Sequence, residues 1–589
     1  MDEFQEHGVD AFVIHPRVGL PREMGWMSHS LLDAMHAVIA EARRRGMWVI
    51  LYDEGMYPSG SSSGQVVREN PAYQCRGLVR INLDRVQPGS VEQGVRIGPD
   101  GELLLADNQT LVAEVGYKGQ RYAIVDRPVD AVIRGLHFIH ENTDEPPEHL
   151  PPAADLLNPD AVACFIRLVY ERYYEEFGSD FGATIQAIFT DEPMLLGRPR
   201  EIGIVPGTTN ILTYVNAYLG YDFTPYLPML WDADADDTIK DDYNRALAAR
   251  LEETYYARLC QWCSDHNIAL TGHPAEPDAV RHLRYFHIPG QDIVWRQIEP
   301  DTPSALEGRQ STQAKAAAST MLHTGRRRNA NEFCGAYGHD LTFDEMRWLA
   351  NWLLIRGCNL LIPHAFYYSV RGPRKHERPP DVGIHSSWWD ARFTAFAQAC
   401  RRLCWLNTDS EHVCHIAILG EHHNLPWRAA KHCYENQVDF NYLAVDDFMN
   451  ADCTAGSPIT IGSQTYHVLI IDHDISAAVK AKQQQLSDCV QAIFWAEDGN
   501  ASVKAIRNLR PAFFEPGADM KGLRLRHVRK MGFDWYMLFN EGAEALTCRI
   551  TCQNAYLLNP YADAMTEFSG TLSLAGHELA VLARKDEDR

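Results

Sequence analysis

The chain of 589 residues lacks several features that would assign it to particular functional classes. No apolar stretch approaches the roughly 20 residues that span a bilayer, and the polar start MDEFQEHGVD is unlike a secretory signal. Lys and Arg number 55 against 78 Asp and Glu, and the resulting net charge of −23 repels phosphate backbones and anionic lipids. We therefore expect a cytoplasmic protein that binds neither nucleic acid nor membranes.

Motifs for metal binding are also scarce. The 14 cysteines are scattered through apolar segments, which is typical of reduced core thiols, and the single C-x-x-C pair, Cys260 and Cys263, has no second pair to match it. The chain has no H-E-x-x-H motif, and His15-Pro16-Arg17 does not supply an H-x-H. We expect no catalytic metal, and a structural Ca²⁺ held by carboxylates and carbonyl oxygens is the one cofactor left open.

Residues 1–410 repeat a short apolar run, a polar turn and a segment of helical periodicity, which is the pattern of a parallel α/β fold. Seven runs are visible, at 11–14, 47–52, 185–190, 268–271, 292–297, 330–333 and 359–363. We predict a (β/α)8 TIM-barrel-type catalytic domain. Met1 opens directly into a helical segment, so either the first strand lies upstream of this sequence or the barrel is built differently.

Three further segments depart from this rhythm. Residues 75–140 alternate as short strands and predict a β insertion, 411–502 predict a small flavodoxin- or amidotransferase-like α/β domain, and 503–589 predict a C-terminal β domain. The α/β segment lacks a Gly-rich phosphate turn and a nucleophile elbow. A structural or assembly role is therefore favoured for it over an amidotransferase-like catalytic one.

The residues that follow the apolar runs are unusually polar. In parallel barrels the reactive side chains stand at the carboxyl ends of the strands. The candidates there are His15, Arg17, Asp53, Glu54, Tyr57, Asp191, Glu192, His273, Glu299, Asn331, Glu332, His364 and Tyr367. Several carboxylates with few lysines suit acid and base chemistry on a neutral polyhydroxyl substrate.

Glu192 and Glu332 are the strongest catalytic candidates. Asp191 stands beside Glu192 and raises its pKa, which is how a general acid stays protonated near neutrality. A pair of this kind acts as acid/base and nucleophile at about 5 Å, or as acid and water-activating base at about 6.5–9.5 Å. Asp191 itself is more typical of a helix cap or a loop residue.

Other features allow two interpretations each. The segment 57–64, YPSGSSSG, is either a flexible loop or a substrate loop. Trp388 and Trp389 form either a platform on which a sugar stacks or part of the core. For the candidate histidines, capping or core positions weigh about as much as function.

Several motifs carry a resemblance to a known group of enzymes. FVIHPRVGL, LYDEGMYPSGSSSG, IFTDEP and FCGAYGHDLTFDEMRWLANWLLIRGCNLLIPHAFYYS resemble barrel glycoside hydrolases of clan A. Within that clan, the chain resembles bacterial proteins akin to the family 106 α-L-rhamnosidases and to the family 42 β-galactosidases with a trimerisation domain. The resemblance covers most of residues 8–500.

The resemblance implies hydrolysis of a glycosidic bond by two glutamates. Glu192 matches the acid/base position and Glu332 the position of the nucleophile or base, while the other candidates would bind hydroxyls. Asp191 departs from the pattern, because clan A enzymes usually have Asn before the acid/base glutamate. The dipeptide Asn331-Glu332 does occur here, so an exchange of the two roles stays open.

The sequence therefore predicts a glycoside hydrolase that acts on a carbohydrate of unidentified sugar and linkage. The alternative is a non-catalytic carbohydrate-binding protein with a degenerate barrel. A homo-oligomer formed through the α/β domain is implied by the resemblance alone.

Overall fold

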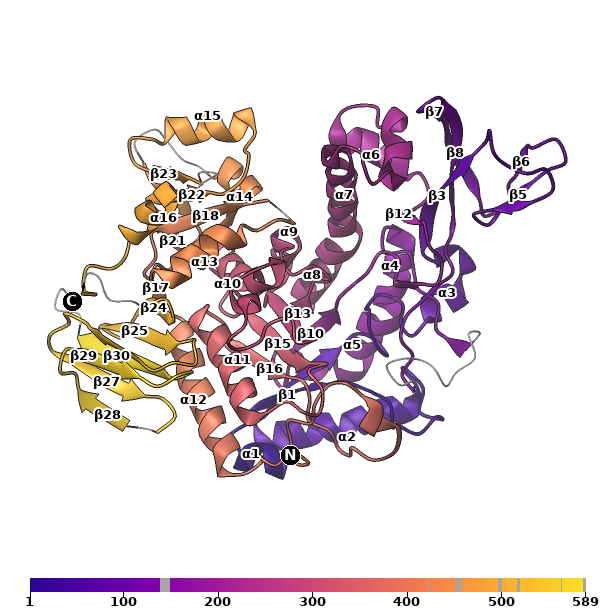
Figure 1. Cartoon of the computed structure of the whole chain (residues 1–589). Helices are drawn as coiled ribbons and strands as arrows, with labels where there is room; N and C mark the ends of the chain where they lie inside the picture. Colours follow the sequence, from indigo (N-terminus) through magenta and orange to yellow (C-terminus); the bar gives the residue numbers. More distant parts are fainter. Residues whose placement is uncertain are drawn as a thin grey trace. The chain divides into compact units, whose positions relative to one another are not determined.

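The structure is a computed structural model that describes residues 1–137, 149–421, 423–451, 457–495, 500–515, 520–562 and 564–585. The chain divides into two compact units (Figure 1). One is Val13–Leu270, and the other combines Met1–Phe12 with Thr271–Arg589. We call them the first and the second unit and describe each by itself.

All seven predicted apolar runs form strands. They are β1 (Ala11–Ile14), β2 (Trp48–Tyr52), β10 (Ile185–Asp191), β13 (Ala269–His273), β14 (Gly290–Val294), β15 (Ala330–Gly335) and β16 (Leu360–Pro363). In the described part of the chain they form two sheets, with the orders β1-β2-β10-β13 and β14-β15-β16. The pairs β2/β10, β14/β15 and β15/β16 are parallel. The α/β class is confirmed, whereas closure of the strands into a barrel stays a prediction.

The helices begin and end where the sequence favours it. Ser28 accepts a hydrogen bond from the backbone N–H of Leu31 at the start of α2 (His29–Arg45), which ends at the left-handed Gly46. Thr342 and Glu345 form a capping box at the start of α11 (Phe343–Ile355). The other helices up to residue 410 are α1 (Asp2–Glu6), α3 (Gln65–Glu69), α4 (Pro159–Ile166), α5 (Arg172–Phe177), α6 (Ile211–Leu219), α7 (Asp237–Leu251), α8 (Ala257–Asp265), α9 (Val280–Leu283), α10 (Gln313–His323) and α12 (Ala391–Asn407).

The segment predicted as a β insertion forms antiparallel strands in the first unit. One sheet has the order β12-β3-β8-β7, from β3 (Arg76–Asn82), β7 (Thr110–Tyr117), β8 (Gln120–Pro128) and β12 (Val205–Gly207). The shorter strands are β4 (Val91–Glu92), β5 (Val95–Ile97), β6 (Leu103–Leu104), β9 (Ala131–Val132) and β11 (Arg198–Pro199). Residues 138–140, the end of the predicted insertion, lie outside the described residues.

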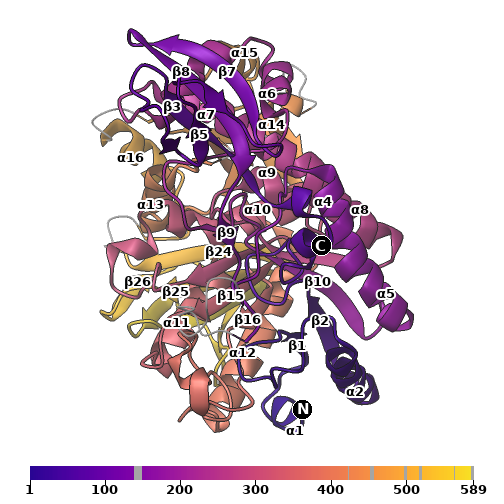
Figure 2. The same cartoon turned by 90° about the vertical axis from the view of Figure 1, so that its right-hand side faces the viewer.

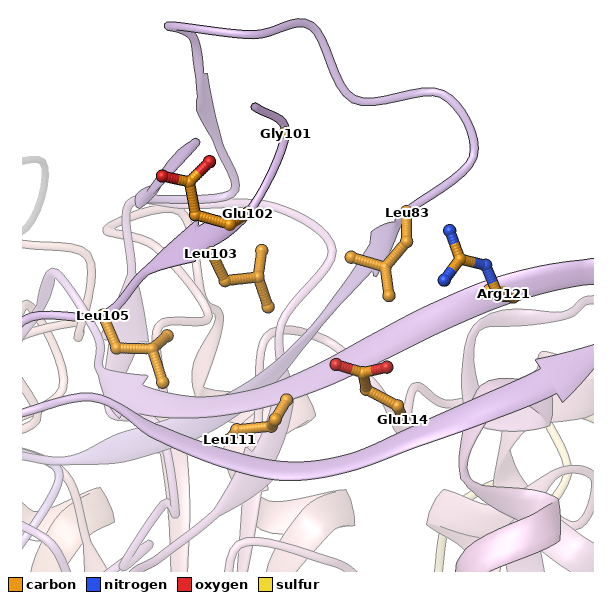
Figure 3. Close-up of a pocket in the computed structure, with 8 residues that line it drawn as sticks. All are labelled: Leu83, Gly101, Glu102, Leu103, Leu105, Leu111, Glu114 and Arg121. Atoms are coloured by element: carbon orange, nitrogen blue, oxygen red, sulfur yellow. The ribbon is translucent and has the colours of Figure 1, made fainter. Parts of the chain in front are cut away.

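A hollow of about 330 Å³ lies between these strands (Figure 3). Four leucines line it together with Glu102, Glu114 and Arg121. The candidate catalytic residues are not among its lining residues.

Residues 411–507 contain a parallel sheet of the order β19-β18-β22-β23 in the second unit. Its strands are β18 (Ile416–Gly420), β19 (Asn441–Ala444), β22 (Val468–Ile471) and β23 (Gln491–Phe494). The helices are α13 (Trp427–Glu435), α14 (Val445–Asn450), α15 (Ala477–Gln485) and α16 (Asn500–Arg507), and β20 (Ile459–Ile461) pairs with β21 (Gln464–Tyr466). Strands and helices alternate along this segment, and its assignment as a flavodoxin- or amidotransferase-like domain stays a prediction.

The chain ends in an antiparallel sheet of the order β17-β24-β25-β30-β27-β28. Its strands are β17 (Glu411–His412), β24 (Leu523–Lys530), β25 (Phe533–Asn540), β27 (Ala555–Asn559), β28 (Ala564–Glu567) and β30 (Leu579–Lys585), and β26 (Leu546–Arg549) pairs with β29 (Thr571–Leu574). Helices α11 and α12 lie beside this sheet in both views (Figure 1; Figure 2).

Helix α11 packs against both β15 and the C-terminal sheet of the second unit. Its Trp348 and Trp352 are fully buried in one apolar cluster with Phe333 of β15 and Met537 of β25. Burial of this many large side chains fixes β15 against the rest of the unit. Among the described helices, none is both long and apolar enough to cross a lipid bilayer.

Candidate active site

The candidate site residues fall into two groups, one in each unit. The second unit holds His273, Glu299, Asn331, Glu332, His364 and Tyr367. The first unit holds His15, Arg17, Asp53, Glu54, Tyr57, Asp191 and Glu192.

Glu332 lies in β15, and two imidazole rings flank its carboxylate. His273, the last residue of β13, places Nε2 3.4 Å from Glu332 Oε2. His364, directly after β16, places Nδ1 in hydrogen-bond contact with Oε1. The side chains of His273 and Glu332 are only 2% and 12% exposed. Each carboxylate oxygen therefore has an imidazole partner in a nearly dry environment.

These contacts set the protonation state of Glu332. Burial raises the pKa of this carboxyl, but the charge of His364 and the hydrogen bond to His273 lower it by more, so the pKa lies well below its ordinary value. A carboxylate that stays ionised can attack a carbon atom or accept a proton, but it cannot donate one. Glu332 is therefore suited to the role of nucleophile or base.

Asp292 belongs to the same group, although it is not among the sequence candidates. The register of β14 on β15 places Asp292 opposite Glu332. One carboxylate oxygen of each and a ring nitrogen of His273 all lie within 4.8 Å of one another. The run at 292–297 places the strand too late, because β14 is Gly290–Val294. A lone Asp inside an apolar strand is the signal that could have identified it.

This trio could also hold a cation. Its donors are one imidazole nitrogen and two carboxylates. Such a set suits a transition metal better than Ca²⁺, which takes six or more oxygen ligands. The same contacts also position a catalytic carboxylate, and a chelation experiment distinguishes the two uses.

Three other candidates of the second unit have structural partners. Asn331 is fully buried and donates to Cys358 Sγ at 3.2 Å, because successive residues of a strand point to opposite faces. The hydroxyl of buried Tyr367 donates to the carbonyl of Pro379 at 3.3 Å. Glu299 lies beyond β14 and accepts from Arg296 at 3.1 Å. Asn331 and Tyr367 thus have partners within this unit, while their expected contacts with a sugar stay predictions. Which of the two glutamates is the acid stays open as well.

In the first unit, hydrogen bonds connect the ends of β2 and β10. The hydroxyl of Tyr52 donates to Asp191 Oδ2, and the ring of His15 stacks on Tyr52 with centroids 3.8 Å apart. Ser59 Oγ accepts from the backbone N–H of Asp191 and donates to Asp53 Oδ1 at 2.5 Å. Burial raises the pKa of Asp53 to about 7. Asp53 and Asp191 thus hold the rim of this unit together.

Glu192 directly follows β10 at a special backbone position. It is half-buried and has a φ of 42°, in the left-handed region that few residues other than glycine adopt. Burial raises the pKa of Tyr57, and the charge of Glu192 raises it further, so the two side chains interact electrostatically. Arg17, after β1, is half-buried as well.

Glu54 organises the serine-rich loop. It is completely buried, and its carboxylate accepts hydrogen bonds from the backbone N–H groups of Gly55, Ser61, Ser62 and Ser63. The segment 57–64 is therefore wrapped around Glu54 as an ordered loop. Direct binding of a sugar hydroxyl by Glu54 would require these bonds to break, so its contacts favour a structural role.

Trp388 and Trp389 are half-buried and pack against the apolar cluster around α11 in the second unit. The indole N–H of Trp389 donates to Glu3 at 2.9 Å, and its ring stacks on His7 with centroids 4.5 Å apart. Trp388 packs against Phe343. Of the two interpretations, these contacts favour core packing over a sugar platform.

Comparison with known proteins shows that the fold of this chain is similar to solved structures. Neither a family model nor a curated protein sequence matches the chain. Among solved structures, a β-galactosidase from Rahnella sp. R3 has a TM-score of 0.61 at 10% identity, with 99% of this chain and 95% of that chain covered. A β-galactosidase from Bacillus circulans sp. alkalophilus has a TM-score of 0.59 at 10% identity, with 99% and 96% covered.

A rhamnosidase from Novosphingobium sp. PP1Y is also similar, with a TM-score of 0.56 at 14% identity. The match covers 80% of this chain and 51% of that enzyme, so the chain spans about half of its length. At these identities the likeness concerns the fold. The expected resemblance to such enzymes is confirmed for the fold alone.

Proposed function

We propose that this chain is a glycoside hydrolase whose Glu332 is the ionised member of a catalytic carboxylate pair. Glu332 attacks the anomeric carbon or activates a water molecule, and Glu192 protonates the glycosidic oxygen. The observation that carries the proposal is the position of the Glu332 carboxylate between the imidazoles of His273 and His364.

The surroundings of Glu192 support its part in the proposal. Asp191 is its immediate neighbour and lies almost buried at the end of β10. A second carboxylate nearby and partial burial both favour the protonated form of a carboxyl, which is the form that an acid catalyst needs. Two glutamates in different protonation states then divide the acid and base roles between them.

The fold supports the catalytic class. The described pairs among the seven strands are parallel, and the similar structures are named as glycosidases. We propose that the strands belong to a (β/α)8-type barrel with a carbohydrate as its substrate. The polar strand ends provide the hydroxyl-binding groups that such a substrate needs.

The test is hydrolysis of a panel of nitrophenyl glycosides, including α-L-rhamnoside, β-D-galactoside and β-D-glucoside. Glu192→Gln should lower turnover about 10²–10⁴-fold on the mononitrophenyl substrate that wild type cleaves best. The same variant should retain activity on the matching 2,4-dinitrophenyl glycoside, whose leaving group departs without a proton.

Equal losses on both leaving groups would contradict the acid role of Glu192. Absence of wild-type turnover across the panel would contradict the enzymatic assignment. In that case, thermal stabilisation by a sugar without hydrolysis would identify a binding protein instead.

A further inference from the structure

Trp295 has an unusual position at the carboxyl end of β14. It is 41% exposed, although a Trp gains more than most residues from burial. Both Trp295 and the next residue, Arg296, have left-handed backbones with φ of 59° and 52°. Two successive bulky residues in this region are costly, and such positions cluster at ligand sites.

The backbone around Trp295 is fixed at several points. Its N–H donates to the carbonyl of Gly335 at 2.9 Å, which ties the end of β14 to the end of β15. Arg296 donates to the carbonyl of Tyr337 at 2.9 Å and to Glu345 at 2.9 Å. The indole is therefore held exposed by a rigid turn.

A cation lies over this indole. The guanidinium carbon of Arg378 is 4.8 Å from the centre of the Trp295 ring. The backbone carbonyl of Arg378 accepts from the N–H of Gly338 at 2.9 Å, which places this segment next to the turn that follows β15. An aromatic face beside a fork of N–H donors suits a pyranose, which has an apolar C–H face and hydroxyl groups around its rim.

The register relates this surface to the catalytic carboxylate. Asp292 lies opposite Glu332, and Trp295 comes three residues later along the same strand direction. The N–H of Trp295 bonds to Gly335, which comes three residues after Glu332 in β15, so at about 3.3 Å per strand residue the backbone of Trp295 lies about 10 Å beyond Glu332 toward the carboxyl edge. This is too far for the sugar whose bond is cleaved, but it is in reach of a sugar further along the same chain.

We propose that Trp295 and Arg378 form a binding subsite for a pyranose ring one or more positions away from the cleaved bond, so that the substrate is an oligosaccharide. The sugar stacks on the exposed part of the indole, and the guanidinium donates to its hydroxyls. This inference rests on the proposed function for the direction in which the oligosaccharide lies across the site. Binding of the oligosaccharide itself requires no turnover.

The test is calorimetric binding of β-1,4-galactotetraose, cellotetraose and a rhamnose-terminated tetrasaccharide, each compared with its monosaccharide. The full chain carries Glu332→Gln, so that no substrate is consumed. At least one tetrasaccharide should bind more tightly than its monosaccharide, and Trp295→Ala should weaken that binding about tenfold. Trp295→Phe keeps an aromatic face and should restore part of the loss.

Trp405 provides a matched control. It is 44% exposed and has Lys530 over its ring at 4.3 Å, but it lies on α12. Trp405→Ala should bind the tetrasaccharide as the parent does. The proposal would be overturned if no tetrasaccharide bound more tightly than its monosaccharide, if Trp295→Ala bound normally, or if both Ala variants lost affinity equally.

Failure of the subsite proposal can be distinguished from failure of the proposed function. Binding that depends on Trp295 in a chain that hydrolyses no glycoside would overturn the enzyme assignment and keep the subsite. Hydrolysis that depends on Glu332, together with a tetrasaccharide affinity that Trp295→Ala leaves unchanged, would overturn the subsite and keep the enzyme assignment.

Discussion

At the residue scale, the chemistry of Glu332 depends on a balance between burial and its two imidazole neighbours. Burial alone would raise its pKa and favour the neutral acid. His364 and His273 reverse this effect. The carboxylate is thereby prepared for attack or for proton abstraction before any substrate arrives.

Replacement of His364 by Gln keeps a polar side chain but removes the positive charge. The pKa of Glu332 should rise, and because catalysis needs the ionised form, the acid limb of the kcat/KM profile should move to higher pH by about one pH unit or more. A pH series with the best nitrophenyl glycoside measures this shift. His385→Gln is the control, since His385 contacts the carbonyl of Tyr368 instead. An unchanged acid limb in His364→Gln would contradict the assignment.

Removal of metal ions tests whether His273, Asp292 and Glu332 hold a catalytic cation. The proposal uses the lone pairs of Glu332 for carbon or proton chemistry, so dialysis against EDTA should leave kcat/KM unchanged. Metal analysis of the same samples shows whether an ion was removed. Loss of activity that Zn²⁺ or Mn²⁺ restores would instead assign the trio to a catalytic metal.

At the element scale, the sequence predicts the strands of the parallel sheets well, because short apolar runs between polar turns have few alternatives. The prediction is weakest for β14. The strand starts at Gly290 and stops where Trp295 turns left-handed, whereas the apolar pattern suggests 292–297. For this reason the sequence pattern points to Glu299 and not to Asp292. A backbone turn that depends on contacts with the next strand leaves no local signal.

The loop around Glu54 provides a stability prediction at the same scale. Glu54→Gln puts an N–H₂ donor where the carboxylate accepts backbone N–H groups, so some of these groups lose their partner at about 1–3 kcal/mol each. Hydrogen exchange read by mass spectrometry on a peptide covering residues 55–65 should become faster by roughly tenfold or more.

Glu69→Gln is the matched control for this loop, because its carboxylate forms an exposed ion pair with Arg167. Exchange in the 55–65 peptide should stay at the wild-type rate in that variant. Wild-type protection in Glu54→Gln would mean that the loop is held by other contacts.

At the scale of the whole molecule, buried charges connect distant parts of the second unit. Asp439 contacts Lys315 of α10 at 2.5 Å, His412 of β17 at 2.7 Å and Arg526 of β24 at 3.7 Å. Burial raises the pKa of Asp439, but the charge of Lys315, the hydrogen bond with His412 and the charge of Arg526 lower it by more, so Asp439 stays ionised. The residue pairs are far apart in sequence, so no motif predicts this cluster.

Asp439→Asn should strongly destabilise the second unit, since it leaves buried cations without their counter-charge at a cost of about 3–5 kcal/mol. Scanning calorimetry should show one transition at a temperature several degrees lower. Asp409→Asn, which breaks an exposed pair with Arg327, should leave the transitions in place. Equal transition temperatures in both variants would show that the cluster contributes little.

The packing of the whole molecule also determines which features of the site can be predicted from the sequence. The sequence predicts polar residues at strand ends, because parallel strands present their carboxyl ends at one edge. It does not predict that His273 and His364 meet the two oxygens of Glu332, since the contact of His364 depends on the register of β15 and β16 and that of His273 on the packing of β13 beside β15. The residue types can be read from the sequence, whereas the protonation state of Glu332 depends on how the strands pack.

The most direct measurement is turnover by Glu332→Gln on the nitrophenyl glycoside that wild type cleaves best, with thermal unfolding recorded on the same samples. The two proteins should unfold at similar temperatures, and kcat should fall by about 10⁴-fold or more, because the ionised carboxylate is lost while its shape is kept. Turnover close to that of wild type in a folded Glu332→Gln protein would contradict the account.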